Sequence, residues 1–144
     1  MLDEFKNVMK QEDKKLLLKD LCARLPYGVK CEVKYYDDAW ELLAIYTNGT
    51  TYAARDIGYP IETYFEDCKP YLFPLSSMTQ EIMDEIYNNA GVYDIDMDSS
   101  VHIEVGTTFE DLTKISDILH KHHIDYRGLI PKGLANDATN KNIY

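Results

Sequence analysis

The feature that most constrains the fold is a change in the spacing of apolar residues along the chain. Between residues 13 and 25 the apolar side chains fall three and four positions apart, as on one face of a helix. From Val29 to Tyr35 they alternate with charged residues, which is typical of a strand with one buried face. The chain is therefore expected to combine separate helices with half-buried strands.

Three helices are predicted, each bounded by residues that start or stop helices. They cover residues 13–25, 77–89 and 107–122, counted from the capping residue. Asp13 is expected to cap the first helix, and Pro26 to end it. The other two begin at capping boxes, in which a hydroxyl residue precedes Gln or Glu by three positions. These pairs are Ser77 with Gln80 and Thr107 with Glu110.

Strands are predicted between these helices. They cover residues 29–35, 40–47 and 50–54, a short stretch near 64–68, and the two arms of a hairpin over 92–105 whose loop is formed by residues 98–100. Asn48 and Gly49 form the tight turn between the second and third strands. Pro70 and Pro74 are expected to follow the short stretch and, with Ser76 and Ser77, to form a rigid entry to the middle helix.

The element order predicted from the sequence is α-β-β-β-α-β-β-α, with the strands in antiparallel hairpins or a meander. Helices set apart from hairpins in this way indicate an α+β fold rather than a parallel sheet. The 144 residues have the length of a single domain. Residues 1–12 are expected to form a loosely attached helical segment, and residues 135–144 a C-terminal tail.

The charges are distributed unevenly along the chain. The formal net charge is −10, and residues 37–112 contain two basic residues, Arg55 and Lys69, against sixteen carboxylates. Such a stretch repels phosphate groups, so direct nucleic-acid binding is not expected. It favours a partner protein with a basic surface, or a cation. A solvated acidic surface that maintains solubility is the alternative.

Neither export nor membrane insertion is expected. The longest apolar stretches span a few residues, whereas a membrane helix needs about 20. The three cysteines, Cys22, Cys31 and Cys68, are an odd number without close spacing, so reduced thiols and a cytoplasmic location are expected. Cys22 and Cys31 fall on the apolar faces of a helix and a strand, and both are predicted to lie in the core.

The first candidate for chemistry is a run of alternating carboxylates, Asp94, Asp96 and Asp98. Carboxylates with this spacing can converge on a hard cation such as Ca²⁺ or Mg²⁺. An EF-hand loop starting at Asp94 would require glycine at its sixth position and glutamate at its twelfth, where this chain has Ser99 and Val105. The simpler explanation is a charged strand edge that resists pairing with other chains.

The predicted register of this hairpin places His102 and Glu104 on the same strand face as Asp94 and Asp96. His102 and Glu104 form the H-x-E triplet of zinc deaminases, but those enzymes also need a later cysteine pair, and no cysteine follows Cys68. The pair is therefore interpreted as the polar face of a strand.

Two histidines at the end of the last helix are a second candidate for metal binding. His120 and His123 lie one turn apart and would bind a transition metal if Asp125 supplied a third ligand. The alternative is structural, because a protonated histidine in the last turn favours the negative end of the helix dipole. No nucleophile motif or phosphate-binding glycine loop is present in the sequence.

Twelve tyrosines are the unusual feature of the composition, and eight of them lie between residues 27 and 71. Tyrosine provides rigid contact area with a polar tip, which suits protein interfaces. It is also common at half-buried positions in sheets. The tyrosines therefore have two possible roles, as a surface for a partner or as the edge of the core.

Three separated blocks of sequence are similar to a known family. They are DLCARLPYGV at residues 20–29, KPYLFPLSSMT at 69–79, and HHIDYRGLI with KGLA within 122–135. The chain resembles small uncharacterised proteins encoded by phages and prophages of gut bacteria. This resemblance implies a mobile-element setting, but it does not indicate any activity. In the third block, Asp125 and Arg127 are expected to brace the turn at Gly128, while Tyr126 packs beside them.

The leading hypothesis is a non-enzymatic accessory protein that binds another protein. Its acidic, tyrosine-rich surface would meet a basic patch on a host or phage component, in one version by mimicking the charge of a nucleic acid. No cofactor is expected. The alternative is a small metal-dependent enzyme with an Asp/His cluster that includes His102, His120 and His123. The candidate binding residues are Asp94, Asp96, Asp98, Glu104, Tyr126 and Arg127.

Overall fold

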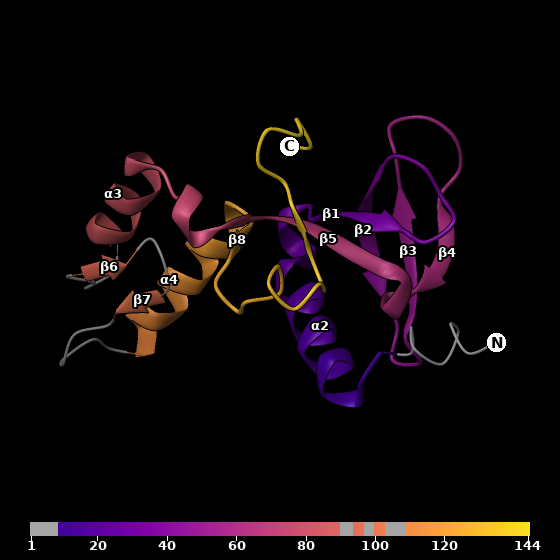
Figure 1. The fold of residues 1–144 in the computed structure, drawn as a ribbon, viewed down its shortest axis with the longest axis horizontal. Coiled ribbons are helices and arrows are strands. Elements are labelled where there is room, and N and C mark those ends of the chain that lie inside the picture. The colour runs from indigo at the N-terminus through magenta and orange to yellow at the C-terminus, as the bar shows by residue number, and fades with distance from the viewer. Residues whose placement is uncertain (1–8, 90–93, 97–99, 103–108) are drawn as a thin grey trace. The chain divides into compact units, whose positions relative to one another are not determined.

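The computed structural model describes residues 9–89, 94–96, 100–102 and 109–144 (Figure 1). The described elements confirm the predicted α+β class, with three α-helices and a mixed sheet of seven strands. The strands of this sheet hydrogen-bond in the order β4-β3-β2-β1-β5-β8, and β9 also pairs with β5. The chain divides into two compact units, Met1–Pro70 and Tyr71–Tyr144, each described by itself. The prediction of a single domain stays a prediction.

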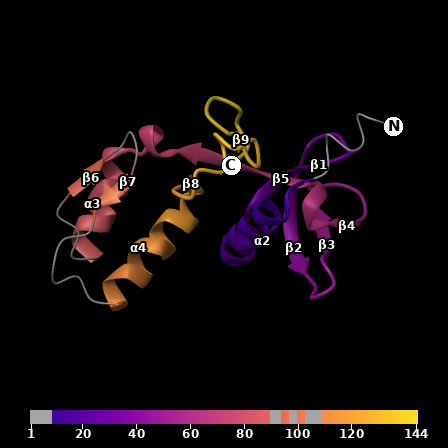
Figure 2. The same cartoon turned by 60° about the horizontal axis from the view of Figure 1, so that its bottom comes forward.

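The first unit combines one α-helix with an antiparallel sheet, and Figure 2 shows the helix lying alongside strand β2. Two short 3-10 turns, η1 and η2, connect its elements. The elements are α2 (Gln11–Arg24), η1 (Leu25–Tyr27), β1 (Lys30–Val33), β2 (Ala39–Ile45), β3 (Thr50–Ala54), β4 (Ile61–Tyr64), η2 (Phe65–Asp67) and the beginning of β5 (Cys68–Pro74).

The strands of this unit form because their side chains alternate between the core and the other side of the sheet. Cys31 and Val33 are fully buried, as predicted, while Glu32 between them is exposed. Leu17 and Leu21 of α2 are buried too, so the helix contributes to the same core. Burial of each such side chain stabilises the fold by about 1.5–3 kcal/mol.

The β2–β3 hairpin has the predicted turn. Gly49 has a φ of 89°, a left-handed conformation that glycine adopts without strain. The amide of Thr50 donates to Asn48 Oδ1 at 3.0 Å, which closes the turn through a side chain. The register then shifts between Leu42 and Ala44, where β2 contains a bulge.

Helix α2 differs from its prediction in two respects. It begins at Gln11, so Asp13 lies in the first turn instead of capping the helix. Asp20 is fully buried, and its carboxylate accepts a hydrogen bond from Arg24 Nε at 2.8 Å, one turn later. The prediction of a buried Cys22 is wrong, since this side chain is exposed.

The region from residue 55 to residue 75 differs most from prediction. In place of one short strand near 64–68, it forms β4, the turn η2 and then β5, which continues through Pro70 to Pro74. Pro70 pairs with Cys31 of β1. The amide of Lys34 donates to the carbonyl of Asp67, so these two residues form a hydrogen-bonded pair. Because hydrogen-bonded and non-hydrogen-bonded pairs alternate in an antiparallel ladder, Pro70 and Cys31 form a non-hydrogen-bonded pair, and the nitrogen of Pro70 points away from β1. A proline therefore costs this ladder no hydrogen bond.

The second unit contains two α-helices that pack against each other around a common apolar core. Its elements are the rest of β5, η3 (Leu75–Ser77), α3 (Gln80–Asn89), β6 (Asp94–Asp96), β7 (Ser100–His102), α4 (Phe109–Lys121), β8 (Ile124–Asp125) and β9 (Asn136–Asp137). Their common core consists of Leu75, Met78, Ile86, Ile115, Ile118, Leu119 and Ile124. Ile86 of α3 and Ile115, Ile118 and Leu119 of α4 lie in this core, whereas Tyr87 and Leu112, which have the same helical spacing, are exposed.

The start of α3 differs from the predicted capping box. The amide of Ile82 donates to Thr79 Oγ1 at 3.3 Å, whereas Ser77 belongs to the preceding turn η3. Thr79 is therefore the capping residue. The second predicted capping residue, Thr107, lies outside the described residues.

The C-terminal segment pairs with β5 in parallel, which the sequence did not predict. Tyr71 is paired with Asn136, and the amide of Ala138 donates to the carbonyl of Leu72 at 2.8 Å. Ala135 and Ala138 are buried. No helix among the described residues is long and apolar enough to cross a membrane.

Candidate functional site

Exposed aromatic side chains are concentrated in the first unit. Of the ten large apolar or aromatic side chains that are exposed in the described part of the chain, seven lie between residues 35 and 64. The same stretch contains five carboxylates and one basic residue, Arg55. We call this set the tyrosine surface; its exposed members are Tyr35, Tyr36, Leu43, Tyr46, Ile57, Tyr59 and Tyr64.

Two loops bring part of this surface together. Residues 34–38 connect β1 to β2, and residues 55–60 connect β3 to β4. Because β2 and β3 are antiparallel neighbours, the start of β2 and the end of β3 lie at the same end of the sheet. We call these two segments the loop pair.

Arg55 fastens the two loops to each other. Its Nη1 lies 3.0 Å from Asp38 Oδ2, and its Nε donates to the carbonyl of Ile57 at 3.1 Å. Its guanidinium also lies 4.9 Å from the ring centroid of the buried Trp40. The basic residue of this stretch is thus engaged with its neighbours. The other carboxylates of the loop pair, Asp37 and Asp56, are exposed.

Tyr35 has an unfavourable backbone conformation at the tip of the first loop. Its φ is 73°, in the left-handed region that bulky residues rarely adopt. Its side chain is 90% exposed, so the ring gains little burial in return. The prediction that Tyr35 shares the buried face of its strand is wrong, because β1 ends at Val33. Residues with a strained backbone cluster at functional sites.

A groove of about 500 Å³ lies beside the loop pair. It contains three carboxylates, two basic residues and three apolar side chains, so it suits a ligand that has both cationic and apolar groups. Its lining residues are Lys30, Asp38, Ala39, Glu41, Ala54, Arg55, Asp56 and Ile57.

A second part of the tyrosine surface follows strands β2 to β4. Tyr46 and Tyr52 meet edge to face, with their ring centroids 5.7 Å apart. The hydroxyl of Tyr52 donates to Glu62 Oε2 at 3.4 Å. The negative charge of Glu62 raises the pKa of Tyr52, because it disfavours the phenolate. Tyr64, on the same strand as Glu62, is 60% exposed.

The cysteines of this unit do not favour nucleophilic chemistry. Burial raises the pKa of Cys68 to about 11, and burial raises that of Cys31 well above its ordinary value. Both thiols are therefore protonated at neutral pH, whereas a thiolate is the reactive form.

The predicted carboxylate site lies partly within the described residues. β6 and β7 pair antiparallel, with Asp94 opposite His102 and Asp96 opposite Ser100. The hairpin and its strand faces agree with the prediction, but Ser100, which was predicted in the loop, belongs to β7 and pairs with Asp96. Asp98 and Glu104 lie outside the described residues. The proposal of a binding site at these residues stays a prediction.

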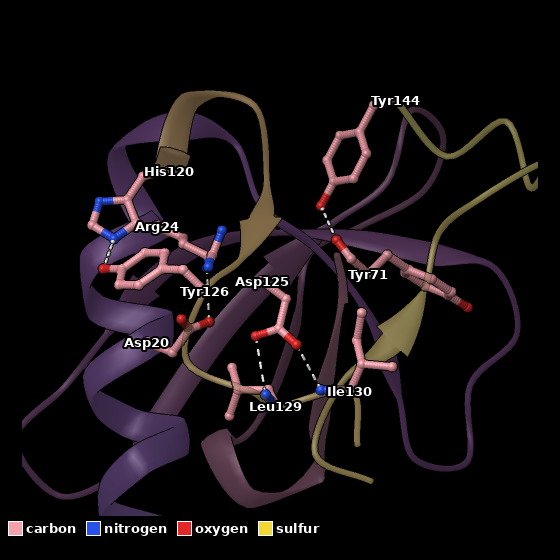
Figure 3. A network of polar contacts seen from close by, with 9 residues as sticks. All are labelled: Asp20, Arg24, Tyr71, His120, Asp125, Tyr126, Leu129, Ile130 and Tyr144. Atoms are coloured by element: carbon pink, nitrogen blue, oxygen red, sulfur yellow. Dashed lines mark hydrogen bonds and ion pairs between the residues drawn. The ribbon is translucent and has the colours of Figure 1, made fainter. Parts of the chain in front are cut away.

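Figure 3 shows where the residues predicted around the last helix lie. His120 Nε2 is 2.7 Å from the hydroxyl of Tyr126. Both carboxylate oxygens of the buried Asp125 accept backbone bonds, at 3.0 Å from Leu129 and 2.9 Å from Ile130. Asp125 therefore braces the turn, as expected, and it does so through backbone amides.

The other two residues predicted in this region also contact aromatic rings. The His123 ring stacks on Tyr144, with centroids 3.7 Å apart, and the hydroxyl of Tyr144 donates to the carbonyl of Tyr71 at 2.8 Å (Figure 3). The Arg127 guanidinium lies 4.7 Å from the ring centroid of Tyr126. Within the described ranges, no three His, Cys, Asp or Glu side chains are placed to hold a metal ion.

The sequence indicated an acidic and tyrosine-rich partner surface but did not locate it. The usable signals were the pair Asp37-Asp38 and the segment Gly58-Tyr59-Pro60, each of which marks a turn between strands. Comparison with protein-family models, with curated proteins and with solved structures found no match.

Proposed function

We propose that this chain is an accessory protein that binds another protein through the tyrosine surface, without catalysing a reaction. The observation that supports it most is the pair of loops, linked by Arg55, that carry Tyr35 and Tyr59, each 90% exposed. Large aromatic side chains in fixed positions lose little conformational entropy on binding and are common at the centres of interfaces.

The charge around these side chains favours a basic partner. Five carboxylates accompany the tyrosines of residues 35–64, and Arg55 is already engaged with Asp38. Such a surface attracts lysine and arginine side chains, and it accelerates encounter at low salt. The resemblance to phage and prophage proteins supports a mobile-element setting, in which the partner is a host or phage component.

The proposal is tested by capture on the immobilised full chain from a lysate of the cell that encodes it, at about 50 mM and about 500 mM NaCl. We expect a discrete basic protein that is retained at low salt and released at high salt. Replacing Tyr35 and Tyr59 together by serine should weaken its capture at least about 30-fold, since each removes an interface anchor.

The matched control is Tyr87→Ser, which removes an exposed tyrosine from α3 in the second unit. It should leave capture unchanged. Equal capture by the control and by the doubly substituted chain would contradict the proposed surface. Displacement of the captured protein by a polyanion such as heparin would support the version in which the surface mimics nucleic-acid charge.

A further inference from the structure

The outer edge of strand β4 carries backbone groups that point away from its sheet. In the described residues β4 pairs with β3 alone. The amide of Phe65 donates to the carbonyl of Gly49 at 3.0 Å, which sets the phase of this antiparallel ladder. Because hydrogen-bonded pairs alternate along the strand, the backbone N–H and C=O of Thr63 bond to β3. The N–H and C=O of Glu62 and the N–H of Tyr64 point to the other side, away from the sheet.

The side chains beside these groups differ between the two sides of the strand. Glu62 and Tyr64 are exposed on one side, and Ile61 and Thr63 are half-buried on the other. A strand added along this edge would place every second side chain beside the carboxylate of Glu62 and the ring of Tyr64, both of which attract a cation. Its alternate side chains would pack beside Ile61.

The charge around the edge selects what can pair with it. Residues 56–68 contain four carboxylates and no lysine or arginine, and one of the four, Glu66, pairs with Lys14 of α2 at 3.4 Å. A second copy of the same strand would bring like charges together, which disfavours pairing of the chain with itself. A strand with basic side chains would instead bring opposite charges together, which favours pairing.

We propose that the outer edge of β4 binds an extended segment of the partner, in which basic and apolar residues alternate, by adding it as an antiparallel strand. This is a known mode of peptide recognition, in which backbone bonds hold the segment and alternate side chains select it. The inference rests on the proposed function, and it specifies how the basic partner is held.

The test uses a synthetic peptide of alternating lysine and valine, about seven residues long, added to the isotopically labelled full chain. In an antiparallel pairing, the residue opposite Glu62 has its side chain on the same side, so lysines take these positions and their amides point toward β4. Methylating the lysine amides should weaken binding at least about ten-fold. The isomer methylated on the valine amides should bind as the parent peptide does.

Amide exchange measured by NMR locates the bound strand. The amides of Glu62 and Tyr64 should exchange rapidly in the free chain and become protected when the peptide binds, while the amide of Thr63 serves as an internal reference. Protection of Glu62 and Tyr64 before the peptide is added would show that another segment or a second copy already covers this edge, and would overturn the proposal.

Charge is tested separately with Glu62→Lys, which should weaken peptide binding at least about ten-fold. The matched control is Glu81→Lys on α3, an exposed position with the same change in charge. Equal binding of the two methylated isomers, or no binding of the peptide at low salt, would overturn the strand-addition proposal. If the natural partner is still captured through Tyr35 and Tyr59, the proposed function survives that result.

Discussion

At the scale of single residues, the tyrosine surface contains a side chain that reduces the stability of the fold. Tyr35 combines a positive φ with an almost fully exposed ring, and its neighbour Lys34 adds a cation–π contact at 5.2 Å. At an exposed position this contact contributes about 0.5 kcal/mol. The strained backbone of a bulky residue costs about 1 kcal/mol or more.

Replacing Tyr35 by glycine should therefore raise the free energy of unfolding by about 0.5 kcal/mol, because glycine adopts this conformation without strain. The same change should weaken partner capture at least about ten-fold. Urea unfolding and capture are measured on the same preparation. A lower free energy of unfolding would show that the Tyr35 ring stabilises the fold. Its exposed position would then be explained without a binding partner.

Arg55 is the second residue whose role can be isolated. Replacing it by lysine keeps the charge but removes the planar group that contacts Asp38, Ile57 and Trp40 together. We expect the free energy of unfolding to fall by about 1 kcal/mol. Amide exchange should accelerate in both segments of the loop pair. Acceleration in the second loop alone would contradict the role of Arg55 as their link.

At the scale of elements, a polar cluster joins α3 to α4. Glu85 of α3 lies 2.6 Å from Lys121 Nζ and 2.9 Å from His122 Nε2. Hydrogen bonds from Lys121 and then His122 lower the pKa of Glu85 below its ordinary value of 4.5. The ionised carboxylate is thus favoured in the folded state.

The sign of the pH dependence follows from this shift. A carboxyl group whose pKa is lowered by folding contributes stability above its unfolded pKa, and that contribution is lost as the pH falls through the folded pKa. Glu85→Gln should lower the free energy of unfolding by about 0.5–1 kcal/mol at pH 7. As the pH falls below 4.5 this difference should shrink, and it should vanish once the pH is below the lowered pKa of Glu85 in the folded state. Urea titrations at both pH values test this, and a constant difference would contradict it.

Predictability from sequence also differs between elements. Thr50–Ala54 was predicted with the observed bounds, because its alternation and the Asn48-Gly49 turn are local signals. β5 was missed because it contains two prolines, which normally argue against a strand. Proline fits a strand only where its nitrogen faces away from the neighbouring strand, and the sequence does not show which positions these are. β8 and β9 have two residues each and are defined by their pairing with β5. Strands this short carry no periodic signal.

At the scale of the whole molecule, the net charge of −10 should oppose folding at low salt. We expect the free energy of unfolding to rise by about 0.5–1 kcal/mol between about 20 mM and about 300 mM NaCl, because salt screens repulsion among carboxylates. Calcium or magnesium at the same ionic strength should not raise the free energy of unfolding beyond the value measured in NaCl. A stabilisation specific to either cation would favour the metal-dependent alternative.

The candidate site could be predicted in composition but not in position. An excess of carboxylates and tyrosines in the middle of the chain indicated a surface for a basic partner. The residues singled out were Asp94, Asp96 and their neighbours, whereas the exposed aromatic groups gather on the loop pair and on strands β2 to β4. Exposure depends on which face of a strand is covered and on where a strand ends.

The sequence by itself determined the α+β class, the core helices and the first hairpins, since apolar spacing and turn residues act over a few neighbouring positions. The tertiary structure alone decided that Asp20 and Arg24, one turn apart on α2, are buried, that Tyr35 points outward, and that Arg55 joins two loops. The physical reason is that burial, ion pairing and strand pairing bring together groups far apart in the chain. Their energies depend on distances that no local pattern specifies.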